Sequence, residues 1–532
     1  MTPAPAAGSD ACLLPPLRID VAAMPENAWD VVAARMADLR ALQGAVTLLT
    51  WDQETYLPRA GAEARGEQLS TLQGLYHEKL TAPELGDAME KAEDRPFSPA
   101  LSPAGGEGEE AAWRAALRAL RFDRDRAVKV PARLVRELAR RQSSALVAWR
   151  EAREESRFER FAPELEQLLA LRREQAQAIG VPEGGELYDA LLDGYEEGMR
   201  VARLEPLFRR LQGWLAPLVE RLAARPPPPD PFAGRRFDSE QQWQLTLEVL
   251  GAMGFDLEAG RQDRSIHPFT LGVDPRDVRL TTRLLEDAPL SALFSTLHEG
   301  GHGLYEQGLP AAQRRTFVCA AASLGLHESQ SRLWENLVGR SRPFWSHLLP
   351  RLRARFPALA DVDLDTFLRA VNRVERTLIR TESDEVTYNL HIALRFELEL
   401  GMLRGELSVK DLPQAWDDAM ERLLGVRPQR VAEGVLQDIH WAWGELGYFP
   451  TYTIGNLYSA SLFAAARAAL PRLDDDLAAG RLLPLRDWLR EHVHRHGRAL
   501  PAEEIVRRAT GRGLSDDDFR AYLETKYGAP QP

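Results

Sequence analysis

The chain has 532 residues, a formal net charge of −12, 44% hydrophobic and 27% charged residues, which is typical of a soluble globular protein with a large core. The acidic balance argues against nucleic-acid binding, which normally requires a basic face. Two cysteines, Cys12 and Cys319, are too few for a disulfide framework.

The first residues of the chain, 1–26, are rich in Ala and Pro. They lack the basic start and apolar stretch of a secretory signal, so we interpret them as a loose N-terminal extension. No run of about 18 apolar residues follows, so we expect no membrane span. Together with the low cysteine content, these features favour a cytoplasmic protein.

Helical periodicity dominates the rest of the chain, because apolar residues recur at steps of three and four. Proline-rich stretches at 95–110 and 225–234 interrupt it and predict loops, since proline prevents helix continuation. Helices of similar character lie on both sides, so we predict one helical domain over 27–532. The predicted helices before the middle of the chain are 29–49, 114–120, 132–154, 164–179 and 204–222.

One segment, Asp277 to Thr282, alternates in polarity and carries β-branched residues, which predicts a short strand. A lone strand is unstable, so we expect a small sheet of a few strands there. Helices are predicted at 294–306, 324–338 and 365–403. The fold class is therefore mostly α with a small β-sheet.

The sequence STLHEGGHGLY, residues 295–305, places His298 and His302 four residues apart. On a helix both imidazoles lie on one face, and zinc accepts two such nitrogens. Glu299 beside them is suited to act as a general base. Gly300, Gly301 and Gly303 permit the close approach either of substrate or of a packed neighbour; an ordinary helix face with unrelated histidines is the alternative.

A catalytic zinc ion needs a third protein ligand. Glu306 lies about 12 Å along the helix from His298, so we interpret it as an outer or surface residue. Glu328 lies in the segment HESQS at 327–331, which begins 25 residues after His302, and this is enough chain for a second helix that crosses beside the first, with His327 as a neighbour. We favour Glu328 as the ligand over a solvated carboxylate.

Several segments together resemble the carboxypeptidase Taq family of zinc metallocarboxypeptidases, from about residue 30 to near the C-terminus. The family's Ala is replaced by Ser383, and the first 26 residues have no counterpart. The matching motifs are HExxH at 298–302, HES(R/Q)S at 327–331, DxRxT at 277–281, (I/V)RxxAD at 379–384 and GxxQDxHW at 434–441.

The resemblance implies an elongated helical gluzincin-type fold with a deep substrate groove and the small sheet near the active site. It implies His298, His302 and Glu328 as metal ligands and Glu299 as the general base that acts on a metal-activated water. Zn²⁺ is the expected metal, with Co²⁺ in its place in some family members. It also implies a homodimer that removes C-terminal residues from peptides with broad specificity.

A carboxypeptidase must bind a free terminal carboxylate, which suits a bidentate arginine. Arg380 is the first candidate and Arg279 the second; the alternative is a structural salt bridge with Asp384 or Asp277. Further candidates, for stabilising the oxyanion and binding the substrate backbone, are His440, Tyr448 and Tyr452, although core aromatics are equally consistent with the pattern.

A second histidine-rich segment, residues 492–496, lacks a carboxylate in the HExxH position, so a solvated surface run is favoured there. Two other functions stay open. The first is a metal-dependent oligopeptidase that cuts internally, because the metal ligands do not distinguish it from an exopeptidase. The second is an inactive helical peptide-binding scaffold, against which the intact Glu299 argues.

Overall fold

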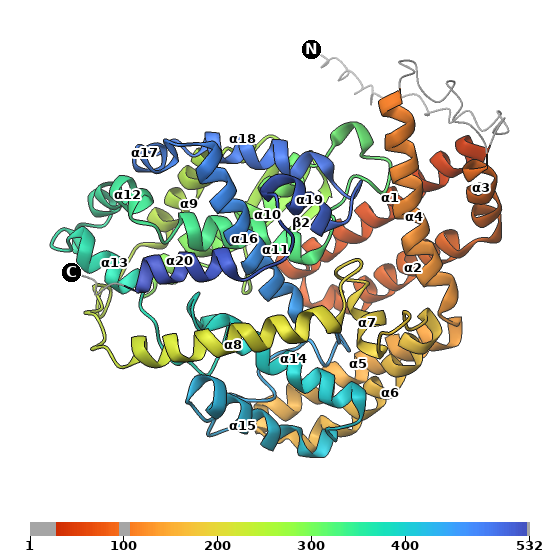
Figure 1. Ribbon diagram of the computed structural model, residues 1–532, viewed down its shortest axis with the longest axis horizontal. Helices are drawn as coiled ribbons and strands as arrows, with labels where there is room; N and C mark the ends of the chain where they lie inside the picture. Colours follow the sequence, from red (N-terminus) through yellow and green to blue (C-terminus); the bar gives the residue numbers. More distant parts are fainter. Residues whose placement is uncertain (1–27, 95–106, 529–532) are drawn as a thin grey trace, which may run out of the picture.

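The structure is a computed structural model that describes residues 28–94 and 107–528. Helices form most of it and surround a small sheet (Figure 1). The helices are α1 Ala28–Thr55, α2 Ala62–Thr81, α3 Pro83–Glu93, α4 Glu107–Lys129, α5 Ala132–Glu155, α6 Ala162–Ile179, α7 Leu187–Leu192, α8 Val201–Ala223, α9 Ser239–Met253, α10 Pro289–Gly308, α11 Leu324–Arg332, α12 Arg342–Arg355, α13 Leu364–Val371, α14 Tyr388–Arg404, α15 Leu412–Leu424, α16 Pro450–Ala469, α17 Leu473–Ala478, α18 Leu483–His492, α19 Ala502–Thr510 and α20 Asp517–Tyr527.

The sheet has the strand order β1-β3-β2, with β1 Gly260–Arg264 parallel and β2 Thr270–Asp274 antiparallel to the central strand β3 Asp277–Thr282. Val278 and Leu280 of β3 are fully buried, and Leu280 packs against the helix α10 that follows the sheet. This confirms the predicted strand and the predicted small sheet, which supports the helix carrying His298 and His302.

The core around that helix is extensive, and a smaller apolar cluster lies among α1, α3 and α4, on the right of Figure 1. Trp29, Val32, Met36 and Leu39 of α1 are at most 1% exposed, as their spacing of three and four residues predicts. The mostly helical fold is confirmed, while the single domain over 27–532 and the deep groove stay predictions. The expected N-terminal extension lies outside the described residues.

The predicted helix over 365–403 is wrong in its middle. Helix α13 ends at Val371 and α14 begins only at Tyr388. Between them the Asp384 carboxylate accepts hydrogen bonds from the backbone N–H groups of Glu375, Val386 and Thr387 at 2.9–3.0 Å. A side chain that binds the backbone in this way replaces the helical ladder, and the resulting loop carries Arg380.

The two proline-rich breaks have different outcomes. The stretch 225–234 is non-helical, as predicted. Most of the other stretch lies outside the described residues. Helix α4 begins at Glu107, so the last four residues of this stretch are helical, and the prediction of a loop to residue 110 is wrong there.

The helix predicted over 324–338 is confirmed, with a π-helical turn, η5 Leu333–Val338, extending α11. Among the described residues, no helix combines the length and apolar character needed to cross a membrane.

Candidate metal centre and active site

Three side chains from the neighbouring helices α10 and α11 converge on one point, and these two helices lie near the middle of the molecule (Figure 1). Oε2 of Glu328 lies 3.8 Å from Nε2 of His298 and 3.4 Å from Nε2 of His302. Ligand atoms at about 2.0–2.1 Å from a tetrahedral zinc ion are about 3.3 Å apart. The donor set and its spacing therefore fit a divalent cation, and it is the only group of this kind found among the described residues.

The glycines of HEGGH bring these two helices together. A Cβ atom on Gly301 would lie 2.5 Å from the carbonyl oxygen of Gln330 in α11. Gly455 of α16 approaches the Glu328 side chain equally closely, since its Cβ would lie 2.7 Å from Cβ of Glu328. Gly300 and Gly303 pack against apolar side chains. Packing, not space for substrate, is therefore the structural reason for the glycines.

His298 is held by a carboxylate, and His302 is held by a ring stack. Nδ1 of His298 lies 2.8 Å from Oε2 of Glu335 in the turn η5. His302 stacks on His327 with ring centroids 4.3 Å apart, and Nε2 of His327 lies 2.9 Å from Oε1 of Glu306. The interpretation of Glu306 as an outer residue and of His327 as a neighbour agrees with these contacts.

Glu335 is a residue that the sequence analysis missed. It lies seven residues after Glu328, which is two helical turns and therefore the same helix face. Arg332, four residues after Glu328, was missed in the same way, and its Nε donates a hydrogen bond of 2.6 Å to Oε1 of Glu328. Burial opposes ionisation of Glu328, but Arg332 and the two histidines hold the pKa of this carboxylate well below its usual value.

Glu299 faces the sheet beside the histidines and is 6% exposed. The hydroxyl of Thr270, the first residue of β2, lies 2.7 Å from Oε2 of Glu299. Burial raises the pKa of this carboxyl group above its ordinary value. A carboxylate with a raised pKa is a better proton acceptor. The edge strand β2 thus orients the side chain that is predicted to act as the general base.

Arg380 is 6% exposed and lies in a cluster of two arginines around one carboxylate. Its Nε and Nη2 donate to Oδ1 of Asp438 at 3.0 and 2.8 Å, and Nη1 donates to the Tyr388 hydroxyl at 2.9 Å. Arg395 donates from Nε to Oδ2 of the same Asp438 at 2.7 Å. The salt-bridge partner of Arg380 is therefore Asp438 and not Asp384. The three charged side chains carry one net positive charge.

The aromatic candidates lie together beside this cluster. Nε2 of His440 is 3.1 Å from the Tyr452 hydroxyl, and the Tyr448 and Tyr452 rings are 5.4 Å apart. Burial lowers the pKa of His440 to about 3, so its imidazole is neutral at physiological pH. Burial raises the pKa of both tyrosines, and the charge of Glu328 adds to this shift. Both tyrosine hydroxyl groups therefore stay protonated. They lie close enough to Glu328 for its negative charge to raise their pKa values.

Arg279 lies elsewhere, on β3. It donates from Nε to Oδ1 of Asp277 at 2.8 Å and covers the ring of Trp51, with its guanidinium carbon 4.3 Å from the ring centroid. The salt bridge with Asp277, the alternative predicted for Arg279, is present.

The second histidine-rich segment is partly buried, which corrects the prediction of a solvated surface run. His494 is 0% exposed, and its Nε2 lies 2.9 Å from Oε1 of Gln330. Helix α18 ends at His492, so His492 and His496 do not share a helix face. Val493, the residue before His494, is apolar and also 0% exposed. Its burial in the core places His494 in the interior beside it.

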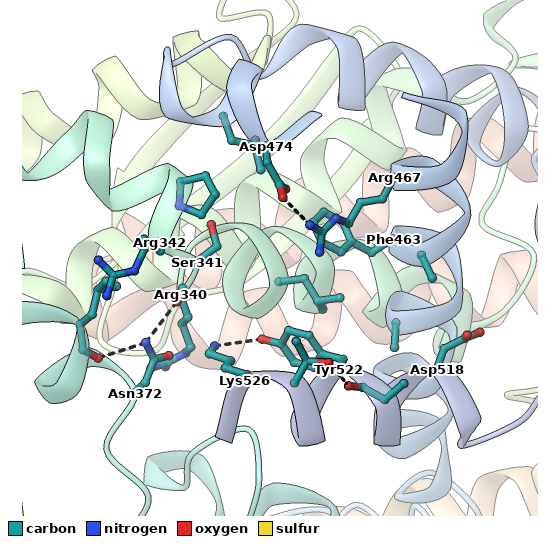
Figure 2. A pocket seen from close by; sticks show the side chains of 18 of the residues that line it. Arg340, Ser341, Arg342, Asn372, Phe463, Arg467, Asp474, Asp518, Tyr522 and Lys526 are labelled. Atoms are coloured by element: carbon teal, nitrogen blue, oxygen red, sulfur yellow. Dashed lines mark hydrogen bonds and ion pairs between the residues drawn. The ribbon is translucent and has the colours of Figure 1, made fainter. Parts of the chain in front are cut away.

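A separate cavity of about 600 Å³ lies between α12, α13, α16 and α20 (Figure 2). None of the predicted site residues lines it. Three of its basic side chains already pair with carboxylates: Arg342 with Asp365, Arg467 with Asp474 and Lys526 with Glu385. We therefore place the chemistry at the convergence of α10 and α11.

Known proteins resemble this chain over nearly its whole length. Residues 31–527 match the family model described as carboxypeptidase Taq (M32) metallopeptidase. Thermostable carboxypeptidase 1 of Thermus thermophilus is 46% identical over 514 residues, covering 95% of this chain and 99% of that protein. The thermostable carboxypeptidase 1 of Pyrococcus furiosus is 37% identical over 503 residues, covering 93% and 97% of the two chains.

Solved structures also resemble this chain over nearly its whole length. The crystal structure of the M32 carboxypeptidase from Deinococcus radiodurans R1 has a TM-score of 0.89 at 42% identity and covers 94% of this chain and 99% of that one. The family assigns a divalent metal to such enzymes, and the His-His-Glu group of this chain fits one. This chain belongs to the carboxypeptidase Taq (M32) family of metallopeptidases, and it is a carboxypeptidase that hydrolyses peptide bonds.

Proposed function

We propose that the enzyme holds one Zn²⁺ ion between His298, His302 and Glu328, and releases C-terminal residues from peptides with broad specificity. The convergence of two Nε2 atoms and one carboxylate oxygen supports this assignment. Co²⁺ has the same charge and accepts the same donors. When bound, such a cation polarises the scissile carbonyl group and lowers the pKa of water.

Glu299 is the proposed general base. Burial raises the affinity of this carboxylate for a proton, and the hydrogen bond from the Thr270 hydroxyl, which by itself lowers that affinity, holds the carboxylate in place. Glu299 takes a proton from the attacking water and then delivers it to the nitrogen of the leaving amino acid. A positioned acid–base group of this kind contributes about 10²–10⁴-fold to the rate.

Arg380 is the proposed reader of the terminal carboxylate. Two arginines share Asp438, so their cluster has a net positive charge that one incoming carboxylate balances. The charge is preorganised, because Asp438 and Tyr388 fix the guanidinium before substrate arrives. Arg279 remains the second candidate. To bind the terminal carboxylate of a substrate, it would have to break or share its contacts with Asp277 and Trp51.

The aromatic group supplies neutral donors near the same place. We propose that His440 and Tyr452, which lie 3.1 Å apart, stabilise the oxyanion of the tetrahedral intermediate, and that Tyr448 binds the substrate backbone. Their pKa shifts support these roles, since a neutral imidazole and a protonated phenol each donate a hydrogen bond without bringing charge.

A homodimer in the cytoplasm is the proposed state of the enzyme. The two cysteines and the acidic charge are compatible with that compartment, and the dimer is a proposal from the family resemblance. Sedimentation of the full chain at two concentrations tests the dimer: a mass near 119 kDa, twice 59.6 kDa, supports it and a monomer mass contradicts it.

The deciding experiment uses one peptide with a free or an amidated C-terminus. Metal-free enzyme and enzyme loaded with Zn²⁺ are compared, and products are identified by mass spectrometry. Stepwise loss of C-terminal residues from the free acid, dependent on metal and much slower with the amide, is the expected result. Internal fragments from both peptides would favour the oligopeptidase, and tight peptide binding without products would favour the scaffold.

A further inference from the structure

Arg332 is a buried arginine that joins two carboxylates at the candidate metal centre. Its side chain is 14% exposed. Nε donates to Oε1 of Glu328 at 2.6 Å, and Nη1 donates to Oε2 of Glu335 at 3.1 Å. The guanidinium carbon lies 4.3 Å above the Tyr388 ring centroid. One planar cation thus touches both a predicted metal ligand and the carboxylate that holds His298.

The local helix geometry explains this arrangement. Glu328 and Arg332 are one turn apart on α11, and the π-helical turn η5 begins at the next residue. The turn carries Glu335 back over the same face, so that its Oε2 reaches both Arg332 and His298. Irregular turns of this type occur frequently at functional sites.

The two oxygens of Glu328 have different surroundings. Oε1 is held by Arg332 at 2.6 Å, whereas Oε2 faces His298 and His302 at 3.8 and 3.4 Å and accepts only a longer hydrogen bond, of 3.2 Å, from the Ser331 hydroxyl. A carboxylate can bind a cation through one or both oxygens. Here the charge-assisted hydrogen bond from Arg332 occupies Oε1 and would compete with a bound cation for that second oxygen.

We propose that Arg332 is a positioning residue that restricts Glu328 to one-oxygen coordination and so keeps the coordination number of the bound metal low. This inference rests on the proposed metal ligands. A low coordination number leaves a position open for water or the scissile carbonyl, which a catalytic site requires. Arg332 serves this purpose better than lysine, because its fork of donors can hold two carboxylates at once.

Tyr388 ties this arrangement to the substrate end of the site. Its ring lies under Arg332, and its hydroxyl accepts the hydrogen bond from Arg380. Tyr388 is 4% exposed and begins helix α14, so its position is fixed by the core. The Tyr388 ring therefore fixes the spacing between Arg332, which contacts the predicted metal ligand Glu328, and Arg380, the proposed binder of the terminal carboxylate.

The test is the visible absorption spectrum of the full-length protein loaded with one equivalent of Co²⁺. Four-coordinate Co²⁺ absorbs more strongly in its visible d–d bands than five- or six-coordinate Co²⁺. The wild-type protein should show the strong bands, and Arg332→Met should lose intensity, because the freed Oε1 joins the coordination shell. Turnover of the variant should fall by about 10- to 100-fold, as is usual for residues that orient metal ligands.

The control is Arg342→Gln, which removes an arginine that is 56% exposed and pairs with Asp365. Its spectrum should match the wild type. If Arg332→Met does not fold, Arg332→Gln is measured in its place with the same expectation. Weak bands in the wild type, or an unchanged spectrum in the variant, would overturn the proposal for Arg332 alone. A wild-type chain that takes up no cation would instead overturn the metal centre itself.

Discussion

His298 presents Nδ1 to Oε2 of Glu335 at a distance of 2.8 Å, which leaves Nε2 directed at the point where His302 and Glu328 converge. The contact fixes a proton on Nδ1, since a carboxylate only accepts, and so leaves Nε2 as the nitrogen available to a cation. It also makes the imidazole a stronger donor toward a cation. Glu335 thus affects the metal site without occupying it.

Replacing Glu335 by Gln should weaken zinc binding by about 10-fold or more, because an amide holds the Nδ1 proton less strongly than a carboxylate. Competition with a chromogenic chelator measures the affinity. Glu491→Gln is the control for loss of a carboxylate, since Glu491 pairs with Arg495 on the surface, with a side chain that is 56% exposed. Equal zinc affinity in the two variants would show that Glu335 does not orient His298.

Replacing His302 by Ala should abolish bound metal, because two protein ligands rarely retain zinc against dialysis. Elemental analysis of the purified variant measures the metal per chain. His492→Ala is the matched control, an exposed histidine at the end of α18, and should keep a full equivalent. A full equivalent in His302→Ala would remove this residue from the ligand set.

Replacing Glu299 by Gln preserves shape but removes the proton acceptor. Metal content should stay the same while kcat falls by about 10²–10⁴-fold. The Thr270 hydroxyl can still donate to the amide oxygen, so the side chain should stay in place. Steady-state kinetics together with elemental analysis separate the two effects, and near-normal turnover with bound metal would rule Glu299 out as the base.

The part of the site that is local in sequence was predictable. His298, Glu299 and His302 share one helix, and spacing alone places both imidazoles on one face. The prediction of Glu328 as a ligand depended on the assumption that a second helix crosses the first. The close approach of the two helices is possible because Gly301 has no Cβ atom. The strand at Asp277 was visible from alternation, because one of its faces is buried against α10.

Long-range partners were not predictable in the same way. Asp438 lies 58 residues after Arg380, and no local rule pairs the two side chains. The break between α13 and α14 depends on backbone hydrogen bonds to Asp384, which periodicity does not register. The burial of His494 likewise depends on its packing against α10 and α11, not on the charged residues beside it.

Glu399 gives a prediction for pH. It accepts hydrogen bonds from Tyr188, Trp441 and the backbone of Gly447, and burial raises its pKa from 4.5 to about 7. The folded protein therefore keeps a proton that the unfolded chain releases, so this contribution to stability is full below pH 4.5 and is lost as the pH rises through about 7.

The loss amounts to roughly 3 kcal/mol across that window, at about 1.36 kcal/mol per pKa unit. Glu399→Gln cannot titrate, so the difference in free energy of unfolding between wild type and variant should shift in favour of the variant as the pH rises. Urea denaturation at several pH values from 4.5 to 8 measures it. A difference that does not change with pH would show that Glu399 has the same pKa in both states.

The preference for the end of a peptide should depend on the pairing of Arg380 with the terminal carboxylate. A charge-assisted hydrogen bond contributes about 1.5–3 kcal/mol, or about one to two powers of ten. Arg380→Ala should lower kcat/KM on free-acid peptides by at least that factor, leave metal content unchanged, and narrow the gap to amidated peptides, which have no carboxylate to lose. Asp438 stays paired with Arg395 in the variant, so the fold should survive. Arg342→Ala is the control: it removes an arginine that is 56% exposed and pairs with Asp365 outside this cluster, and it should preserve both kcat/KM and the preference for free acids. If Arg380→Ala prefers free acids as strongly as the wild type, Arg380 does not read the terminus, and Arg279 becomes the residue to replace.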